Sequence, residues 1–395
     1  MENPKIRFKG FTKDWEQRKL GDDLVSIHTG TNLLGSITNT GMPLIKMGNI
    51  QRGYFDTSKV EFLAENEQPD KADIVNYGDF FFNTRNTLEL VGKGATWMKN
   101  SGEYAFNSNI ARFELRNLDT IFFNYLYNTD YMTKQIHARA MGTTSVAAIY
   151  PRTLDSVEYL APCMKEQQKI GAYFKQLDHL ITLHQRKCEQ TKNLKKYMLQ
   201  KMFPQNGAKV PEIRFNGFTH DWEQRKFGSL LEETRNKTIF EDEDTLLSCA
   251  IDGMYLNSEL FSHFRGSSNI GYLKVKKNDL ILSAQNLHLG NCNVNLRFEH
   301  GIISPAYKVY ELVGCNPLFM QAWVKKDSTK DFFLKSSTEG ASVCRKNIVW
   351  EELYKQELPV PSIEEQTKVG EYFYSLDHLI TLHQRQHKLH LNALL

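Results

Sequence analysis

Short apolar runs separated by Gly, Asn and Pro dominate residues 22–160. Examples are MPLIKMGNI, DFFFNT, IARFEL and VEYLAP. Runs of this length between turn-forming residues are typical of strands and loops. One stretch, about residues 121–141, has apolar side chains at three- and four-residue steps, which predict a helix: Phe122, Tyr125, Met132 and Ile136. The pattern as a whole predicts a mixed α/β domain.

Residues 163–203 have a different pattern, with one Gly and no internal Pro. Apolar side chains recur there every seven residues from Ile170, with a second row three residues later. We therefore predict one long helix, roughly 60 Å in length at 1.5 Å per residue. A second long helix is predicted after Ser362, a residue suited to the N-cap, with Glu365 three residues on.

Each predicted long helix carries an apolar stripe that it cannot bury alone. We expect the two helices to pack on each other, and a pseudo-twofold relation between them makes the pair antiparallel. The alternative is that each helix packs only on its own domain. His184 and His383 are predicted polar interruptions of the stripe. The residues predicted at the helix-pair interface are Ile170, Tyr173, Leu177, Leu180, Leu194, Val369, Tyr372, Leu376 and Leu379.

Two segments of the chain recur about two hundred residues later. PKIRFKGFTKDWEQRKLG at 4–21 returns at 211–228 with fourteen identities, and EQQKIGAYFKQLDHLITLHQR at 166–186 returns at 365–385 with sixteen. The second insert, 229–358, keeps the outline of the first but little of its sequence. A shared frame around different inserts predicts two readers of different ligands in equivalent positions. The predicted fold class is α+β, with two similar mixed α/β domains separated by two long antiparallel, coiled-coil-like helices.

Composition places this chain of 395 residues among ordinary globular proteins, since hydrophobic residues make up 41% and charged residues 24%. There is no apolar run of about 18 residues, and MENPKIRFKG lacks the apolar core of a signal peptide, so we expect a cytoplasmic protein. The six cysteines form no CxxC pair, which indicates reduced thiols and argues against a disulfide framework or a zinc site.

The net charge of +3 is too small to indicate nucleic-acid binding by itself. Two local clusters stand out. Residues 185–201 hold six Lys or Arg against one Glu, and residues 241–244 read EDED. Both are typical of solvated faces.

Motifs of catalysis are missing from the sequence. It contains no GxxxxGK[ST], no GxGxxG opening a helix after a strand, no [DNS]PP[YF] segment of amino-methyltransferases, and no HExxH or GxSxG. His179 and His184 are five residues apart, as are His378 and His383, which on a helix turns each pair about 140° apart. We therefore predict no catalytic residue and no metal site, and favour recognition or scaffolding.

The ordered, duplicated set of segments resembles the specificity subunit of type I restriction-modification enzymes over the whole chain. Each variable insert is followed by P-x-x-x-E-Q-x-x-[IV]-G, from Pro162 to Gly171 and from Pro361 to Gly370, and then by a long helix. DWEQRKLG and DWEQRKFG resemble the segment that introduces each domain in that family. GTTSVAAIYPRTLDSVEYL and GASVCRKNIVWEELYKQEL resemble the ends of its target recognition domains.

The resemblance implies a first target recognition domain at 1–160 and a long spacer helix at 161–204. A linker and a second target recognition domain follow at 205–358, and a second long helix at 359–395. Each domain is expected to read one half of a bipartite site in double-stranded DNA. The helix pair is expected to set the nonspecific gap between the halves.

The resemblance also implies partners and a role in host defence. In this family two methyltransferase subunits, which bind S-adenosylmethionine and methylate adenine, hold one specificity subunit, and a restriction-translocase subunit joins for cleavage. S-adenosylmethionine, ATP and Mg²⁺ are therefore expected on partner subunits and no cofactor on this chain. The chemistry of those partners accounts for the missing catalytic motifs here.

Reading bases in the major groove requires Arg, Lys, Asn, Gln, Ser and Thr on loops held by a rigid sheet, although these residues are also common in turns. In the first domain the predicted DNA-binding residues are Lys46, Asn49, Thr84, Arg85, Asn86, Ser108, Asn109, Thr143, Thr144 and Ser145. In the second domain they are Ser283, Gln285, Asn286, Ser304, Tyr307, Ser342, Arg345 and Lys346. Most differ between the copies, as two different half-sites require.

Two alternatives from other classes remain at this point. One is a duplicated scaffold whose inserts bind proteins and whose helices dimerise. The other is a self-sufficient methyltransferase or nuclease, which the missing motifs disfavour. The duplication is also unequal, because the second helix stops before reaching the equivalent of Met202 and Phe203. Either the PKIRF segment completes the packing there or the chain is truncated.

Overall fold

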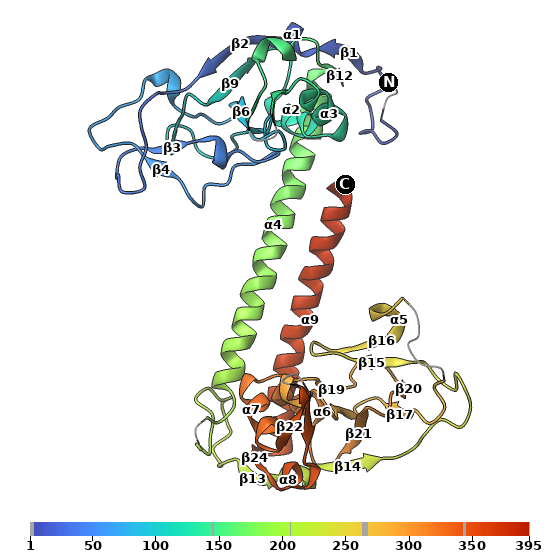
Figure 1. The fold of residues 1–395 in the computed structure, drawn as a ribbon. Coiled ribbons are helices and arrows are strands. Elements are labelled where there is room, and N and C mark those ends of the chain that lie inside the picture. Colours follow the sequence, from blue (N-terminus) through green and yellow to red (C-terminus); the bar gives the residue numbers. More distant parts are fainter. Residues whose placement is uncertain (1–3, 144–145, 206, 263–267, 343–344, 395) are drawn as a thin grey trace. The chain divides into compact units, whose positions relative to one another are not determined.

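The computed structural model describes residues 4–143, 146–205, 207–262, 268–342 and 345–394. The chain forms two compact units (Figure 1). Unit 1 comprises residues 1–181 and 390–395, and unit 2 comprises residues 182–389. Each unit contains one mixed α/β domain and part of each long helix.

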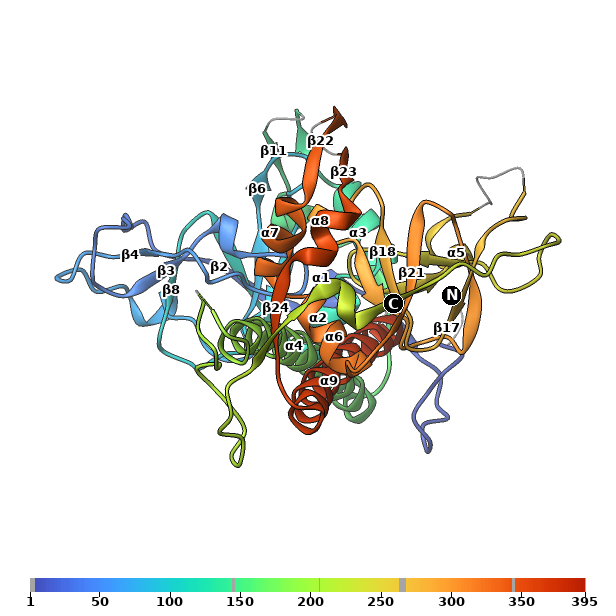
Figure 2. The ribbon, with the colours of Figure 1, turned by 90° about the horizontal axis from the view of Figure 1, so that it is seen from below.

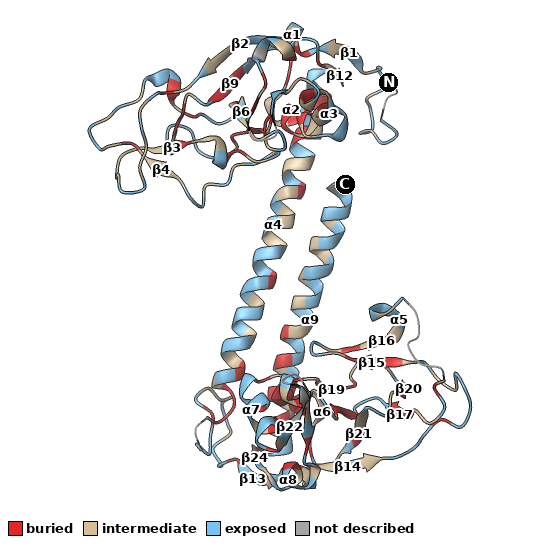
Figure 3. Ribbon diagram, in the orientation of Figure 1, coloured by how far each residue is buried: buried red, intermediate tan, exposed pale blue. Residues whose placement is uncertain are grey.

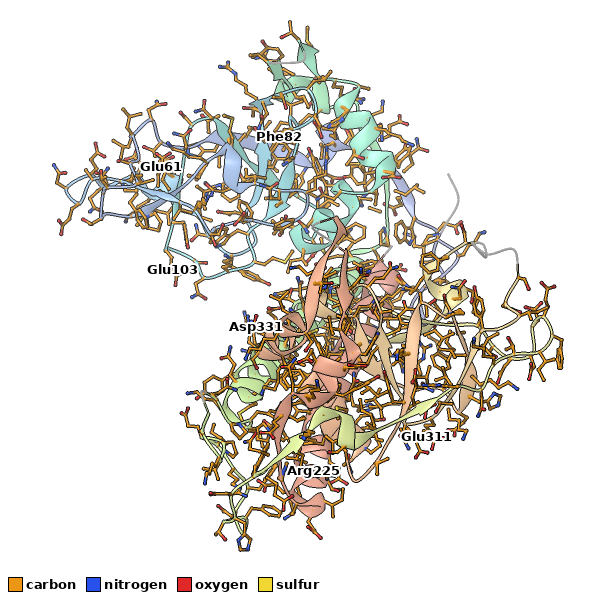
Figure 4. All side chains as sticks on the ribbon, turned by 60° about the horizontal axis from the view of Figure 1, so that its bottom comes forward. Glu61, Phe82, Glu103, Arg225, Glu311 and Asp331 are labelled. Atoms are coloured by element: carbon orange, nitrogen blue, oxygen red, sulfur yellow. The ribbon has the colours of Figure 1, made fainter. Side chains whose placement is uncertain are left out.

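The first domain is built on an antiparallel sheet with the strand order β2-β9-β5-β7. Side chains of β5 alternate between the two faces of this sheet, as they do in any strand. Phe80 and Phe82 pack in the cluster that contains the α2 and α3 side chains, whereas Phe81 packs with Trp97 and Phe106. Phe82 is labelled in Figure 4. Both faces are therefore covered. The strands are β2 (Leu24–Thr29), β5 (Phe80–Asn83), β7 (Gly94–Thr96) and β9 (Ile110–Leu115).

Two helices, α2 (Thr120–Tyr127) and α3 (Asp130–His137), occupy the stretch for which the sequence predicts one helix over 121–141. That prediction is wrong because a new N-cap interrupts the stretch. The Thr129 hydroxyl accepts a hydrogen bond from the Met132 N–H at 3.4 Å, which begins α3. The preceding Asn128 donates its amide to the Gly94 carbonyl at 3.1 Å and holds the bend against β7.

Short elements complete the first domain. β4-β3-β8 and β10-β11-β6 form two three-stranded sheets, and β1 pairs with β12. Glu61 of β4 is labelled in Figure 4. The bounds are β1 (Glu16–Lys19), α1 (Leu20–Asp23), β3 (Pro43–Ile45), η1 (Met47–Asn49), β4 (Glu61–Phe62), η2 (Lys71–Asp73), β6 (Arg85–Asn86), β8 (Ala105–Phe106), β10 (Met141–Gly142), β11 (Ala147–Ala148), η3 (Pro151–Leu154) and β12 (Glu158–Ala161).

The second domain repeats the architecture of the first. Its central sheet has the order β14-β21-β18-β19, and α6 and α7 stand in the places of α2 and α3. The alternation also returns, because Leu280 and Leu282 of β18 pack in one cluster and Ile281 in another. The elements named here are β14 (Leu231–Thr234), β18 (Leu280–Ser283), β19 (Cys292–Val294), β21 (Tyr307–Leu312), α6 (Pro317–Val324) and α7 (Asp327–Lys335).

Four further strand pairs complete the second domain: β13 with β24, β15 with β16, β17 with β20, and β22 with β23. The bounds are β13 (Glu223–Lys226), η4 (Phe227–Leu230), β15 (Leu247–Cys249), β16 (Met254–Leu256), α5 (Asn257–Leu260), β17 (Leu273–Lys276), η5 (Leu287–Leu289), β20 (His300–Ile303), β22 (Ser337–Ser342), β23 (Arg345–Ile348), α8 (Trp350–Lys355) and β24 (Glu357–Val360).

The repeated sequence segments make the same ion pair in each unit. Arg7 Nη2 lies 2.7 Å from Glu166 Oε2, and Arg214 Nε lies 2.7 Å from Glu365 Oε1. In both pairs the glutamate side chain is only 2% exposed. Each pair ties the chain entering a domain to the first turn of a long helix. The duplication therefore preserves this joint between domain and helix.

A glutamine beside each ion pair fixes the same helix to its domain. Gln167 Oε1 accepts a hydrogen bond from the Asp119 N–H at 2.9 Å, and Gln366 Oε1 accepts one from the Asn316 N–H at 2.7 Å. One turn later, a Cβ added to Gly370 would lie 2.7 Å from the Phe319 nitrogen. Glycine is needed there because the helix passes against backbone.

The two long helices are α4 (Met164–Lys201) and α9 (Ile363–Leu394). Within unit 2, three contacts join them. His184 and His383 place their Nδ1 atoms 3.2 Å apart, the Cys188 thiol approaches the Ile380 carbonyl at 4.0 Å, and Lys195 pairs with Asp377 at 2.5 Å. Numbers rise along α4 as they fall along α9, so the segments run antiparallel, side by side in Figure 2. The predicted fold class is confirmed.

After His184, the α4 residues that contact α9 lie one position beyond the predicted row. Leu194 was assigned to the interface by the heptad pattern but is 45% exposed, while Lys195 beside it makes the contact. A straight helix has 3.6 residues per turn, so a strict seven-residue pattern drifts across its face. Leu379 is likewise 41% exposed. The exposed outer faces of both helices are visible in Figure 3.

The remaining predicted interface residues pack largely on their own domains. Ile170 packs against the first domain's core, and Tyr173, 44% exposed, contacts the Phe8 ring. Val369 and Leu376 belong to the second domain's core cluster, which also takes in Leu199, Met202 and Phe203 of the α4 end. Tyr372 packs at the edge of that cluster. Leu177 is buried and Leu180 half-buried.

Candidate nucleic-acid interface

Polar side chains of the first domain gather beside the hairpin formed by β10 and β11. β11 pairs with β6, which carries Arg85 and Asn86 directly after the buried strand β5. Thr84 donates its hydroxyl to the Asn109 carbonyl at 3.1 Å, and Thr143 follows β10. We call this group the first hairpin edge: Thr84, Arg85, Asn86, Asn109 and Thr143.

Arg85 is the strongest candidate of this edge for contact with a base or phosphate. Its side chain is exposed, and no acidic side chain in the described part of the chain pairs with it. Its backbone is fixed, because β6 is paired with β11 and the Arg85 N–H donates to Asn83 Oδ1 at 3.3 Å. An unpaired guanidinium on a held strand can bind guanine or phosphate in a bidentate manner.

Other predicted residues of the first domain have structural partners. Lys46 Nζ lies 2.5 Å from Glu61 Oε2. Asn49 is buried and donates its amide to the carbonyls of Asp56 and Lys59, at 3.0 and 2.8 Å. Lys46 and Asn49 line a polar hollow of about 670 Å³. Ser108 is half-buried, and its N–H donates to the Thr31 carbonyl. Thr144 and Ser145 lie outside the described residues.

The second domain presents an equivalent group beside the hairpin of β22 and β23. Gln285 and Asn286 follow β18, and the Gln285 carbonyl accepts a hydrogen bond from the Lys346 N–H at 3.2 Å. Ser342 and Arg345 face each other in the register of the hairpin, although their side chains lie outside the described ones. We call this group the second hairpin edge: Gln285, Asn286, Ser342, Arg345 and Lys346.

Three predicted residues of the second domain serve the fold itself. The Ser283 hydroxyl accepts from the Asn286 N–H at 3.2 Å, and the Ser304 hydroxyl accepts from the Ala306 N–H at 3.3 Å. Tyr307 donates its hydroxyl to the Cys249 carbonyl at 3.0 Å, and burial raises the pKa of that phenol. These hydroxyls stabilise turns and strand ends.

His288 of η5 belongs with the second hairpin edge, although no sequence motif indicates it. Burial lowers the pKa of His288, and the charge of nearby Lys346 lowers it further. The imidazole is therefore neutral at pH 7. Its Nδ1 is buried without a hydrogen-bond partner in the part of the chain that is described. A neutral imidazole beside a lysine can both accept from and donate to a ligand.

The two hairpin edges occupy the same place in the two domains. Each lies where the chain leaves the third-ordered strand of the central sheet, β5 or β18, and meets a hairpin that follows α3 or α7. The polar side chains differ between them, with Arg85 in one and Lys346 in the other. Equivalent scaffolds therefore present different hydrogen-bonding groups.

The described residues include no helix that is long and apolar enough to cross a membrane. No group of three or more His, Cys, Asp or Glu among them could hold a metal ion. The cysteines that are described are free thiols: Cys188, Cys249, Cys292 and Cys315 are buried and Cys163 is exposed.

Comparison with known proteins links this architecture to one family. Residues 12–193 match the family model described as type I restriction modification DNA specificity domain. A putative type I restriction enzyme MjaX specificity subunit from Methanocaldococcus jannaschii is 21% identical over 95% of this chain and 89% of that protein. The chain is therefore similar to the specificity subunits of type I restriction-modification enzymes.

Solved structures agree with the fold of this chain. The type I restriction-modification S subunit from M. genitalium has a TM-score of 0.60 at 13% identity, over 99% of this chain and 96% of that one. The HsdS subunit from Thermoanaerobacter tengcongensis has a TM-score of 0.43 at 15% identity, over 96% and 95%. The M. genitalium structure supports the two-domain, two-helix architecture of the chain.

Proposed function

We propose that the two hairpin edges read the two halves of a bipartite site in double-stranded DNA. The observation that carries this proposal is the equivalence of the edges: the same sheet order and the same hairpin position hold different side chains in each domain. Two similar domains with different polar edges suit two half-sites of different sequence. Phosphate contacts by surrounding lysines would position each edge, and side chains such as Arg85 would read bases.

The long helices are proposed to set the gap between the half-sites. Two readers on one face of a duplex are about 34 Å apart when separated by one helical turn. With 38 residues, α4 is long enough for that span, at about 57 Å. The domain divisions of this proposal are 1–160 and 205–358 for recognition, and 161–204 and 359–395 for spacing.

The proposed partners are two methyltransferase subunits and restriction-translocase subunits. Support for such an assembly comes from the family, and one structural neighbour is described as a study of complex assembly and conformational transition of the type I system. S-adenosylmethionine, ATP and Mg²⁺ would act on those subunits. A protein-binding scaffold, the second candidate, is not favoured by the match to a DNA specificity domain.

Exchange of one recognition domain tests the proposal. We expect that replacing residues 22–160 with the corresponding domain of another specificity subunit changes one half-site completely and leaves the other half and the gap intact. The readout is the methylome of cells that carry the hybrid with its methyltransferase partners. A change in both halves would show that one domain does not read one half. An unaltered methylome would equally contradict the proposal.

Two point substitutions are expected to act on different half-sites. Arg85→Ala should weaken binding by about 1–3 kcal/mol and relax base preference in one half, since it removes a bidentate donor. Lys346→Ala should act only on the other half. Binding is measured on duplexes in which one half-site at a time is scrambled. Lys71→Ala, on η2 and outside the hairpin edges, is the charge-matched control.

A further inference from the structure

A wide groove in unit 2 lies between the C-terminal part of α4 and the second domain. Its volume is about 1160 Å³. Asp331 of α7, labelled in Figure 4, is one of its lining residues. Four lysines come from α4 and two from the loop that joins α6 to α7: Lys192, Lys195, Lys196, Lys201, Lys325 and Lys326. Four of the six basic residues of the cluster at 185–201 therefore line a groove.

Lys326 is unusual among these lysines because it is only 8% exposed. Its ammonium lies 4.7 Å from the centre of the Phe203 ring. Within the described part of the chain it has no carboxylate, carbonyl or hydroxyl partner. By contrast, Lys325 Nζ donates to the carbonyls of Ile251 and Cys292, at 2.7 and 2.9 Å. The Lys326 side chain is therefore mostly removed from water without an acceptor for its ammonium, which disfavours the charged form.

Lys326 also occupies the N-cap position of α7, and no side chain caps that helix. The equivalent residue of the first domain is Thr129, whose hydroxyl caps α3. The second copy thus has a cation where the first has an acceptor. The N-terminus of a helix carries partial positive charge, which disfavours a cation and attracts an anion. The mostly buried lysine and the helix end without a side-chain cap both favour a negatively charged group at this place.

The pKa of Lys326 supports this account. Burial lowers it to about 8. The ammonium remains mostly protonated at neutral pH, so the groove presents a charge at a site that disfavours it. Bound oxyanions at such a site would pair with the ammonium and accept from the free N–H groups of the first turn of α7.

Other charges of the groove decide what kind of anion fits. Asp377 pairs with Lys195, Glu212 with Lys201, and Asp327 with Lys330 outside the groove lining. Two further carboxylates line the cavity, those of Asp252 and Asp331. A continuous run of phosphates would meet these carboxylates and be repelled. A single carboxylate side chain on a protein segment could reach Lys326 without approaching Asp252 and Asp331.

Apolar side chains in the same lining favour a protein segment as well. Leu199, Tyr255, Leu296, Tyr374 and Ile380 lie among the charged residues. Tyr374 is 51% exposed and so offers its ring to a ligand. A groove lined by apolar side chains and lysines, in which the Lys326 ammonium has no acceptor among the described residues, suits a peptide with one acidic residue beside apolar ones.

We propose that this groove docks a segment of a partner protein through a carboxylate side chain that binds Lys326 and caps α7. The proposal does not depend on which bases the hairpin edges read. It assigns a protein-binding role to the face of unit 2 between α4 and α7, and it gives a role to the lysine that stands where the first copy has a capping threonine.

Binding of a fluorescein-labelled peptide with one glutamate between leucines to the full chain tests the proposal by fluorescence anisotropy. We expect Lys326→Thr to weaken binding by about 10-fold or more, the loss of one charge-assisted contact. Lys335→Met removes the same charge from the exposed far end of α7 and should leave binding unchanged. The same peptide with glutamine in place of the glutamate is the uncharged control, and inorganic phosphate and a short DNA duplex are competing ligands.

Thermal unfolding of the same variants separates binding from folding. Lys326→Thr supplies the cap found in the first domain and removes a buried charge, so its melting temperature should rise while peptide binding falls. Equal weakening by Lys326→Thr and Lys335→Met would overturn the proposal, because net charge alone would then explain binding. Displacement of the labelled peptide by phosphate or duplex at lower concentration than by the same peptide without label would overturn the choice of a protein segment.

Discussion

Inserting four residues into α4 between Asp178 and His184 is expected to lengthen the gap of the recognised site by one or two base pairs. Four residues add about 6 Å to a helix, against about 3.4 Å per base pair of duplex. They also rotate the following segment by about 40° beyond a full turn. An insertion before His184 leaves the register of the His184–His383 and Lys195–Asp377 contacts intact. The bases of both half-sites should not change.

The methylome of cells carrying the lengthened chain measures gap and half-sites together. A replacement of His179 and Thr182 by alanine, which adds no length, should leave the gap unchanged; both side chains are exposed. A four-residue insertion in the exposed turn at 99–102 controls for added length outside the helix. New half-site bases with an unaltered gap would refute the proposal that the helices set the spacing.

Breaking the ion pair between Arg214 and Glu365 is expected to have the largest effect on stability. Arg214 donates from Nε and Nη2 to the two carboxylate oxygens, at 2.7 and 2.8 Å, and from Nη2 to the His220 carbonyl. Arg214→Met would leave the Glu365 carboxylate buried without its counter-charge. Loss of one partner of a buried pair costs about 3–5 kcal/mol. The free energy of unfolding, from urea titration, should fall by that amount.

The double variant separates the ion pair from the packing around it. Arg214→Met with Glu365→Met removes both charges and should recover most of the lost stability. Arg7→Met is the matched substitution in unit 1, where the same geometry joins Arg7 to Glu166. Hydrogen exchange should localise each loss to the first turn of the long helix involved. If the single Arg214 variant were as stable as the double one, this joint would not hold the helix to its domain.

Several parts of the fold follow from local sequence pattern. The predicted helix over 163–203 is observed as Met164–Lys201, because apolar spacing, few glycines and the absence of proline act within a few residues of one another. The duplication of the frame likewise predicts the repeated architecture. His184 and His383, predicted in the helical stripe, do meet across the two helices.

Other predictions failed because they depended on hydrogen-bond partners that the apolar and polar pattern does not reveal. The break at Thr129 depends on a cap that competes with a continuous apolar pattern. Asn49 and Ser283 have the polarity of base readers, but Asn49 donates to the carbonyls of Asp56 and Lys59, and Ser283 accepts from the Asn286 N–H. Arg85 has the same polarity and remains exposed. The polarity of a side chain can be read from its residue type. Its hydrogen-bond partners depend on which segments the fold brings together.

By itself, the sequence determined a duplicated chain with two mixed domains, two long helices and the resemblance to a specificity subunit. Repeats can be read by comparing segments of the sequence, and helical periodicity depends on residues a few positions apart. Only the tertiary structure decided which polar residues form the two hairpin edges, which row of α4 contacts α9, and that Lys326 is buried at an uncapped helix. Those outcomes depend on hydrogen bonds and packing between residues tens to hundreds of positions apart, which no local pattern encodes.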